Sequence, residues 1–392
     1  MSITKSFYKA IIKKMFCDPC EVVFWDGDVE KFGEGENKFK IVFHEQIPKA
    51  EIIKDPSMAL GEGYMNGKFD IEGSVRHIIR AIIDSDSGFL GSNGKGRKFL
   101  GKVSNSVKLS KANASFHYDL GNDFYKLWLD DTMTYSCGYF KSVDDPLKEA
   151  QINKADHILR KLCLREGQSL LDIGCGWGHL LVDAVKKYKV KATGLTLSAE
   201  QYNYVSERIK EEGLEELADV RYLDYREMKN KRFDRIVSVG MLEHVGEEHL
   251  AEYFSQVKRL LQPSGGVSML HCITSQEKSD TNSWISKYIF PGGYIPTLSQ
   301  LVSELIEGGF QILDIENLRR HYTRTLECWT ANFENALPEI RAGRKESFIR
   351  MWRLYLNACA ASFDAGALNL HQILFSNGNN DELPWTRDYM YT

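Results

Sequence analysis

Leu171-Asp172-Ile173-Gly174-Cys175-Gly176-Trp177-Gly178 is the stretch that decides the fold of this 392-residue chain. Its first half continues an apolar run that is typical of a buried strand, and a helix is predicted from about residue 178 to residue 188. The glycines between strand and helix let the backbone turn tightly and approach a ligand closely. The stretch therefore predicts a strand–turn–helix unit at which a ligand binds.

Strands and helices alternate on the carboxyl-terminal side of this stretch. Strands are expected at residues 169–174, 190–197, 219–225, 233–240 and 266–274, and a helix at about residues 248–261 separates the last two. Ser198 is placed to cap a further helix, with Gln201 completing a capping box. The alternation predicts an α/β fold with a doubly wound, mostly parallel sheet, next to a smaller amino-terminal domain of mixed structure.

The glycine-rich turn resembles the S-adenosylmethionine fingerprint of class I methyltransferases, which have this Rossmann-like fold. An acidic residue stands just before the first glycine, and the spacing G-x-G-x-G fits a methyl donor better than a dinucleotide. A different nucleotide or a purely structural turn is the alternative. On this resemblance, the residues expected to contact the donor here are Asp172, Gly174, Gly176 and Gly178.

The second strand departs from the general pattern of that class. Many members end it with an acidic residue that holds the ribose hydroxyls, whereas here it ends in GLTLS at residues 194–198. Thr196 and Gln201 are expected to hydrogen-bond the donor instead. Asp224 and Tyr225 follow the third strand, where the adenine end of the donor would lie.

Composition limits the class of protein. Hydrophobic residues make up 43% of the chain and charged residues 27%, as in globular proteins with a large core, and the net charge of −4 argues against general nucleic-acid binding. No apolar run reaches the roughly 20 residues that span a bilayer, and Lys13 and Lys14 interrupt any secretory signal. A cytoplasmic protein is expected. No metal site is expected either, because Cys17 and Cys20 lack a second pair of ligands.

The predicted domains are a small amino-terminal domain at residues 1–90, a basic linker at residues 91–111 and a catalytic domain at residues 112–392. The stretch from Ser87 to Tyr118 contains no acidic residue, and apolar side chains alternate with its basic ones. Such a mixture is suited to an anionic membrane surface, while the alternative is a solvated linker that packs on the next domain. The basic residues are Lys95, Arg97, Lys98, Lys102, Lys108 and Lys111.

Several further motifs resemble the cyclopropane fatty acid synthase family. They are YDLGNDFY at residues 118–125, MTYSCGYF at residues 133–140, GLTLSAEQ at residues 194–201, SVGMLEHVG at residues 238–246 and YLNACA at residues 355–360. The resemblance extends from about residue 112 to the end of the chain. GEGYMNG at residues 61–67 is similar to the amino-terminal domain of the members that act on phospholipids.

The resemblance implies an enzyme that adds a methylene group from S-adenosylmethionine to the cis double bond of unsaturated phospholipid acyl chains. It further implies a homodimer that sits peripherally at the inner membrane surface. An isolated alkene is a weak nucleophile, so the sulfonium methyl has to be held in line with it in a dry pocket. Methyl transfer leaves a carbocation, which electron-rich aromatic faces stabilise, and loss of a proton from the new methyl group closes the ring.

In this family a bound bicarbonate is understood to accept that proton. The resemblance places its ligands at Cys137, Glu243, His271, Tyr322 and the backbone amide of Ile273. It also places Tyr135 and Ser136 among the donor-binding residues and Cys359 among the candidate active-site residues.

Each of these residues has a structural alternative. A lone histidine in an apolar strand, as His271 is, is usually a satisfied core residue. Cys137 and Cys359 are both candidates for simple packing, and apolar surroundings would raise the pKa of the Cys359 thiol. Five aromatic residues could line an acyl pocket or belong to an ordinary core: Trp284, Tyr288, Phe290, Tyr294 and Trp329.

Two other functions fit parts of the sequence. The first is a methyltransferase for small molecules or amines, which would need a polar acceptor pocket and no bicarbonate site. The second is a non-catalytic lipid-binding protein that keeps the donor fold. The combination of Glu243, His271, Tyr322 and Cys137 counts against the first, and the intact glycines together with Glu243 count against the second.

Overall fold

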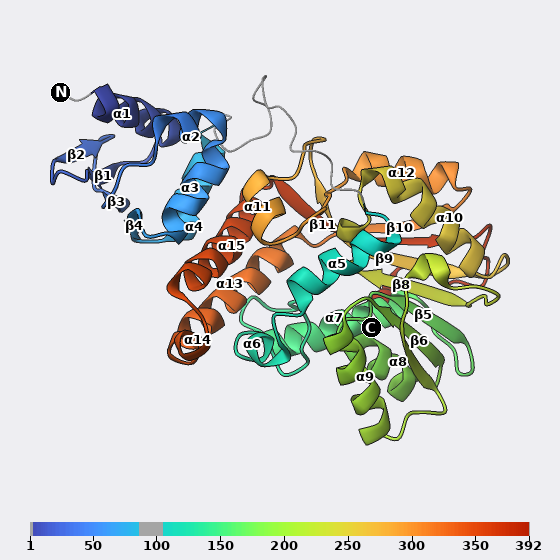
Figure 1. Ribbon diagram of the computed structural model, residues 1–392. Coiled ribbons are helices and arrows are strands. Elements are labelled where there is room, and N and C mark those ends of the chain that lie inside the picture. The colour runs from blue at the N-terminus through green and yellow to red at the C-terminus, as the bar shows by residue number, and fades with distance from the viewer. Residues whose placement is uncertain (1–2, 86–104, 392) are drawn as a thin grey trace. The chain divides into compact units, whose positions relative to one another are not determined.

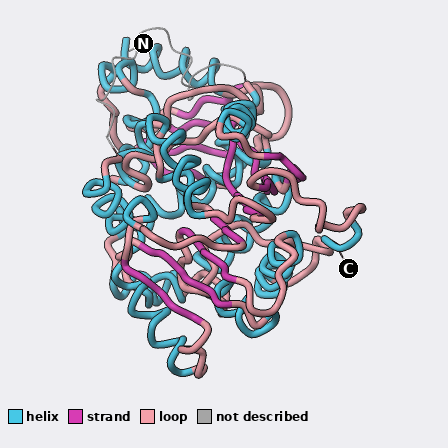
Figure 2. Tube along the Cα trace, turned by 90° about the vertical axis from the view of Figure 1, so that its right-hand side faces the viewer, coloured by secondary structure: helices cyan, strands magenta, loops and turns pink. Residues whose placement is uncertain are grey.

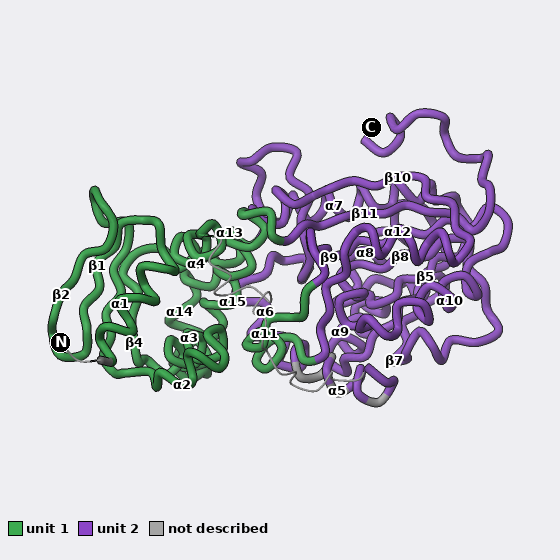
Figure 3. Tube along the Cα trace, turned by 90° about the horizontal axis from the view of Figure 1, so that it is seen from above, with its two compact units in different colours: residues 1–102, 279–291, 326–367 green, residues 103–278, 292–325, 368–392 purple. Residues whose placement is uncertain are grey.

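The computed structural model describes residues 3–85 and 105–391 of the chain. These residues form two compact units, which Figure 3 colours separately. Unit 1 comprises residues 1–102, 279–291 and 326–367, and unit 2 comprises residues 103–278, 292–325 and 368–392. The domain boundaries expected from composition, at residues 90 and 112, assign residues 279–291 and 326–367 to the catalytic domain. In the structure these two segments belong to unit 1.

Unit 2 contains a seven-stranded sheet in the order β10-β11-β9-β8-β5-β6-β7. Its strands are β5 (Ser169–Ile173), β6 (Lys191–Thr196), β7 (Ala218–Tyr222), β8 (Arg235–Val239), β9 (Val267–Ser275), β10 (Gln311–Asn317) and β11 (Leu368–Ser376). Strands β7, β6, β5, β8 and β9 are parallel, whereas β11 pairs antiparallel with β9 and β10. The predicted doubly wound parallel sheet is confirmed. Two further strands, β10 and β11, extend it, and β11 runs antiparallel to both of its neighbours; the sequence did not reveal them.

Helices cover both faces of this sheet (Figures 1 and 2). Those of unit 2 are α5 (Val107–Tyr118), α6 (Asn122–Lys126), α7 (Leu147–Lys161), α8 (His179–Tyr188), α9 (Ala199–Glu211), α10 (Leu250–Leu260), α12 (Leu298–Glu307) and the start of α13 (Arg319–Asn335). One core contains residues of α7, α8 and α9, among them Ile158, Leu181 and Val205. The other contains residues of α10 and α12, such as Phe254 and Leu301. The two cores occupy opposite faces, as expected of a doubly wound sheet.

The order of the strands determines where on the sheet a ligand can bind. The chain moves outward from β5 through β6 to β7 and then returns to add β8 and β9 on the other side of β5. The loops that follow β5 and β8 therefore diverge, and ligands in such sheets bind in the crevice at this switch point. Short 3-10 helices shape the connections around it: η1 (Tyr225–Glu227), η2 (Leu242–His244) and η3 (Glu247–His249), with η4 (Asp388–Met390) near the carboxyl terminus.

Unit 1 has a four-stranded sheet in the order β2-β1-β3-β4. Its strands are β1 (Cys20–Val23), β2 (Val29–Phe32), β3 (Phe39–Phe43) and β4 (Phe69–Glu72). Its helices are α1 (Ile3–Met15), α2 (Lys49–Lys54), α3 (Pro56–Met65), α4 (Val75–Asp84), α11 (Ser283–Tyr288), the rest of α13, α14 (Leu337–Gly343) and α15 (Glu346–Asp364). Aromatic side chains such as Tyr8, Phe24 and Phe43 fill the core between sheet and helices. The predicted mixed amino-terminal structure is thus present, completed by helices from late in the chain.

The basic residues Lys95, Arg97, Lys98 and Lys102 of the predicted linker lie outside the described residues. The last residues of that linker, from Val107 on, begin α5, in which the Lys111 ammonium lies 4.1 Å from the ring centre of Tyr222. None of the described helices is long and apolar enough to cross a membrane. Within the described ranges, no three His, Cys, Asp or Glu side chains form a group that could hold a metal ion.

Candidate active site

The glycine loop follows β5 and ends where α8 begins at His179. Gly174, Gly176 and Gly178 have φ angles of +83°, +55° and +79°, which favour glycine. A Cβ atom on Gly174 would lie 2.9 Å from Cγ of Met241, and one on Gly178 would lie 3.0 Å from Cγ1 of Val205. At Gly176 a Cβ atom would meet nothing within 4 Å. Gly174 and Gly178 are therefore required by packing as well as by conformation, whereas Gly176 faces open space.

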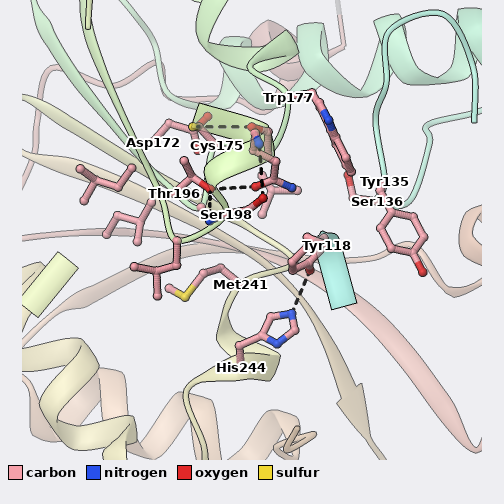
Figure 4. A pocket seen from close by; sticks show the side chains of 18 of the residues that line it. Tyr118, Tyr135, Ser136, Asp172, Cys175, Trp177, Thr196, Ser198, Met241 and His244 are labelled. Atoms are coloured by element: carbon pink, nitrogen blue, oxygen red, sulfur yellow. Dashed lines mark hydrogen bonds between the residues drawn. The ribbon is translucent and has the colours of Figure 1, made fainter. Parts of the chain in front are cut away.

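That open space is a pocket at the switch point of the sheet, enclosing about 1210 Å³ together with its open mouth. Figure 4 shows side chains from β5, β6, α5, η2 and the loop after α6 around it. Of the residues predicted to bind a donor, all except Gly178 line the pocket: Tyr135, Ser136, Asp172, Gly174, Gly176, Thr196, Gln201, Asp224 and Tyr225. The fold thus gathers into one cavity residues that are spread over some 90 positions of the sequence.

A hydrogen-bonded network closes the end of the pocket at β6. The Thr196 hydroxyl donates to Oε1 of Gln201 at 2.8 Å and accepts from the Ser198 amide at 3.1 Å. Ser198 caps α9 as predicted, because its Oγ accepts from the Gln201 amide at 3.3 Å. The reciprocal half of the capping box is not formed, because the Gln201 side chain bonds Thr196 instead. This network fixes two polar side chains at the position where other members of the class carry a carboxylate.

Asp224 is held by its neighbour Arg226. The carboxylate accepts from Nε, Nη2 and the backbone amide of Arg226, at 2.9, 2.8 and 2.9 Å. The guanidinium also donates to the Asn105 carbonyl at 3.0 Å and the Ser110 hydroxyl at 3.1 Å, so it ties the start of α5 to this wall of the pocket. Tyr225 is buried, and burial raises the pKa of its phenol.

Lys154 and His179 are among the pocket residues to which the sequence assigned no role. Lys154 in α7 is 3% exposed and donates from Nζ to Oγ of Ser136 at 2.9 Å. His179 is 9% exposed, and neither of its ring nitrogens has a hydrogen-bond partner in the described part of the chain. Burial lowers the pKa of Lys154 to about 8 and that of His179 to about 4, so the imidazole is neutral near pH 7. A charged residue within the buried face of α7 was the available signal for Lys154.

Glu243 and His271 do not line this pocket, but each has one buried polar atom without a partner among the described residues. Oε1 of Glu243 accepts from the backbone amide of Ile273 at 2.7 Å, while Oε2 is buried and has no partner among the described residues. Burial raises the pKa of the Glu243 carboxyl to about 7, and the hydrogen bond from Ile273 limits the rise. The amide of Ile273, which the resemblance assigned to bicarbonate, therefore donates to Glu243 in this structure.

His271 lies on β9, two residues before Ile273, so both side chains point to the same face of the sheet. The ring is 1% exposed. Nε2 of Gln372 lies 3.2 Å from Nδ1, and since an amide nitrogen only donates, Nδ1 accepts and the proton of the ring is on Nε2. Burial lowers the pKa of His271 well below its usual value, and Nε2 has no partner among the described residues. The ring is thus a neutral donor without an acceptor.

Cys137 and Tyr322 are both close to the carbonyl oxygen of Leu318. The Cys137 sulfur lies 4.0 Å from that oxygen and 3.2 Å from the oxygen of Gly138, and the Tyr322 amide donates to the Leu318 oxygen at 3.2 Å. Cys137 is fully buried, and burial raises the pKa of its thiol far above neutrality. A neutral, enclosed thiol is unsuited to nucleophilic attack.

Cys359 and most of the predicted acyl-pocket aromatics belong to unit 1. Burial raises the pKa of the Cys359 thiol, on α15, to about 12, and this residue does not line the donor pocket. The predicted acyl-pocket aromatics that belong to unit 1 are Trp284, Tyr288, Phe290 and Trp329. Tyr294 belongs to unit 2, where its amide donates to the Glu243 carbonyl at 2.9 Å.

Tyr118 and His244 meet at the rim of the donor pocket. The Tyr118 hydroxyl lies 2.9 Å from Nε2 of His244, and both residues line the cavity (Figure 4). Burial lowers the pKa of His244 to about 4, so the ring is neutral near pH 7. This bond holds the end of α5 against the helix that carries Glu243.

Comparison with known proteins agrees with these features. Residues 105–373 match the family described as mycolic acid cyclopropane synthetase, and residues 7–94 match a domain of unknown function. The chain is 39% identical over 386 residues to a probable fatty acid methyltransferase of Pseudomonas putida, covering 95% of this chain and 96% of the relative. It is 39% identical over 336 residues to cyclopropane-fatty-acyl-phospholipid synthase of Escherichia coli, covering 83% of this chain and 85% of that enzyme.

A solved structure supports the same relationship. Mycolic acid cyclopropane synthase in complex with SAH and CTAB is 35% identical, with a TM-score of 0.64, and the similarity covers 68% of this chain and 97% of that one. The resemblance inferred from the motifs is therefore confirmed. The chain belongs to the mycolic acid cyclopropane synthetase family and is an S-adenosylmethionine-dependent methyltransferase of the cyclopropane synthase type.

Proposed function

We propose that this protein is a cyclopropane synthase for unsaturated phospholipids, which uses S-adenosylmethionine as donor and bicarbonate as base. The observation that carries the proposal is that two of the assigned bicarbonate ligands each have a buried atom without a described partner: Oε2 of Glu243, whose Oε1 bonds the Ile273 amide, and Nε2 of His271 on the same strand as Ile273. Buried polar atoms are nearly always hydrogen-bonded, so such a pair calls for a small ligand.

The donor pocket provides the first requirement of the reaction. Its backbone turn at Gly176 leaves room for a ligand, and Thr196 and Gln201 are fixed where the ribose hydroxyls would lie. Tyr135 and Ser136 line the opposite wall. The pocket would hold the sulfonium carbon of the donor in a fixed orientation against the acceptor. Such fixed proximity and orientation account for a large part of the rate enhancement of a methyl transfer.

The residues beside the pocket fit a bicarbonate ion. A neutral His271 donates from Nε2, and Glu243 is able to accept from a hydroxyl group through Oε2. Tyr322 and Cys137 are the further ligands that the family resemblance implies. When bound there, bicarbonate would supply a mild base that accepts the proton lost on ring closure. Glu243 and His271 hold their positions through Ile273 and Gln372, respectively.

Several observations favour a phospholipid as the acceptor. The relative from Escherichia coli is named for a fatty-acyl-phospholipid substrate, and the relative from Pseudomonas putida matches almost the whole chain, unit 1 included. The basic residues of the segment 91–111 would attract an anionic membrane surface. We therefore propose that the enzyme is cytoplasmic and in peripheral contact with the inner membrane surface. We also propose that it is a homodimer, and sedimentation of the purified protein tests this oligomeric state.

The function is tested with purified protein, donor labelled in its methyl group and vesicles of dioleoyl phosphatidylglycerol. The expected product is a labelled cyclopropane acyl chain, identified by mass spectrometry of the methyl esters, and vesicles with saturated chains give none. Removal of dissolved carbon dioxide should slow the reaction, and added bicarbonate should restore it. Label in a saturated methyl branch, or in an amine acceptor instead of the lipid, would contradict the proposal.

A further inference from the structure

The donor pocket contains a buried lysine that the reaction itself does not require. Lys154 projects from α7, lines the cavity and is 3% exposed. Its Nζ donates to a neutral acceptor, Oγ of Ser136, at 2.9 Å. It forms no ion pair with any carboxylate in the described ranges. A buried ammonium without a counter-charge is unfavourable, so its presence calls for an anionic group in the pocket.

A buried carboxylate lines the same cavity. Asp172, at the end of β5, is 2% exposed and likewise forms no ion pair within the part of the chain that the structure describes. Burial raises the pKa of Asp172 to about 7 and lowers that of Lys154 to about 8, and the charge of each partly offsets the shift of the other. Two opposite charges thus share one pocket without forming a salt bridge. A ligand with one positive and one negative end would satisfy both.

We infer that Lys154 binds the α-carboxylate of the donor's amino-acid moiety, with Asp172 facing its α-ammonium group. The inference rests on S-adenosylmethionine being the donor, as proposed above. Ser136 and His179 support it, because both line the pocket, and the ring nitrogens of His179 lack described partners. The charge of Lys154 also contributes to the lowered pKa of His179, so the two side chains are near each other.

The other anion that Lys154 could serve is the bicarbonate, since its charge also acts on the pKa values of Cys137 and His271. The contacts favour the donor. The hydrogen bond of Lys154 goes to Ser136, which lines the donor pocket, whereas Cys137 and His271 do not line it. Lys154 is therefore a binding residue for the donor and sets its orientation through the carboxylate.

The test is a calorimetric comparison of two ligands. S-adenosylhomocysteine has the α-carboxylate and α-ammonium groups, whereas 5′-methylthioadenosine lacks the whole amino-acid part. Lys154→Met should weaken binding of the first by about ten- to a hundred-fold, as expected for loss of a charged hydrogen bond, and change binding of the second less than about three-fold. Lys148→Met is the matched control, because Lys148 is on the same helix but exposed, with Asp131 as its partner, and should change neither affinity.

Equal effects of Lys154→Met on the two ligands, or no effect on either, would overturn the inference. So would a variant that binds S-adenosylhomocysteine normally but loses its response to bicarbonate. If Lys154→Met does not fold, the wild-type protein still decides, because it should bind decarboxylated S-adenosylmethionine at least about ten-fold more weakly than S-adenosylmethionine; equal affinities would refute the role. A wild-type protein that binds none of these ligands would instead refute the proposed function.

Discussion

The carboxylate of Glu243 accepts a 2.7 Å hydrogen bond from the backbone amide of Ile273, which joins the short helix after β8 to the neighbouring strand β9. One carboxylate oxygen is fixed by this bond, and the other is left buried without a described partner. The backbone of the sheet thus positions Glu243, and a substitution of this residue tests the role of its second oxygen.

Glu243→Gln should slow turnover at least about a hundred-fold, because an amide has a single acceptor oxygen and cannot accept both from the Ile273 amide and from the base. Affinity for S-adenosylhomocysteine should change less than about three-fold, since Glu243 does not line the donor pocket. Turnover with vesicles and calorimetry with the donor product measure the two quantities. Glu248→Gln is the control, because Glu248 is exposed, and unchanged turnover in Glu243→Gln would remove this residue from the mechanism.

The same carboxyl should make stability depend on pH. Its pKa is raised from 4.5 to about 7 in the folded protein, so the folded state binds the proton more tightly than the unfolded state. Stability from this group is present below pH 4.5 and is lost as the pH rises through 7. Relative to Glu243→Gln, the wild-type protein should therefore lose about 2 to 3 kcal/mol of unfolding free energy between pH 5 and pH 8. Urea unfolding at the two pH values measures this, and parallel changes in both proteins would contradict it.

Gly176→Ala should weaken binding of S-adenosylhomocysteine about ten-fold or more, because the added methyl group would extend into the donor pocket. Gly213→Ala is a matched control: Gly213 also has a positive φ, +65° against +55°, and open space around its Cβ position, but does not line the pocket. Both variants should lose about 1 kcal/mol of stability through backbone strain. Similar losses of affinity in the two variants would show that strain, and not contact with the ligand, is responsible.

Neutralising Lys95, Arg97, Lys98 and Lys102 to Gln should weaken binding to anionic vesicles and reduce its dependence on salt, because each basic residue near such a surface contributes about 1 kcal/mol. Co-sedimentation with vesicles at low and high ionic strength measures this. Lys13 and Lys14, in the last turn of α1, provide a control substitution of the same kind. Unaltered affinity would mean that the segment only connects the two units.

The fold of unit 2 was predictable because its signals are local. The glycines after β5 and the capping serine before α9 act within a few residues of their own position. The late strand β11 was not predictable, since the buried polar residues Asn369, His371 and Gln372 interrupt its apolar pattern and find their partners only in the folded sheet. The membership of residues 326–367 in unit 1 also depends on distant contacts. Arg350, for example, donates to the Phe69 carbonyl and to the Asp70 carboxylate, each at 2.7 Å.

The candidate site divides in the same way. The motifs located most of the pocket, because most of the donor-binding residues lie within the motifs themselves. Lys154 was missed, although its place on the buried face of α7 distinguishes it from Lys148; Lys161 is buried on the same helix, and only the folded structure shows which of the two reaches the cavity. The bond between Ile273 and Glu243 was equally hidden, because strand β9 and the loop after β8 meet only through parallel pairing.

The interleaved chain has a consequence for synthesis. The ribosome releases the amino-terminal strands first, yet α15, which bears Arg350, emerges only when residues 346–364 have been translated. Strand β11, which lies between β9 and β10, comes later still. A premature stop codon shortly before residue 368 would therefore leave the sheet of unit 2 without the strand that joins β10 to β9, and one before residue 346 would leave unit 1 incomplete as well.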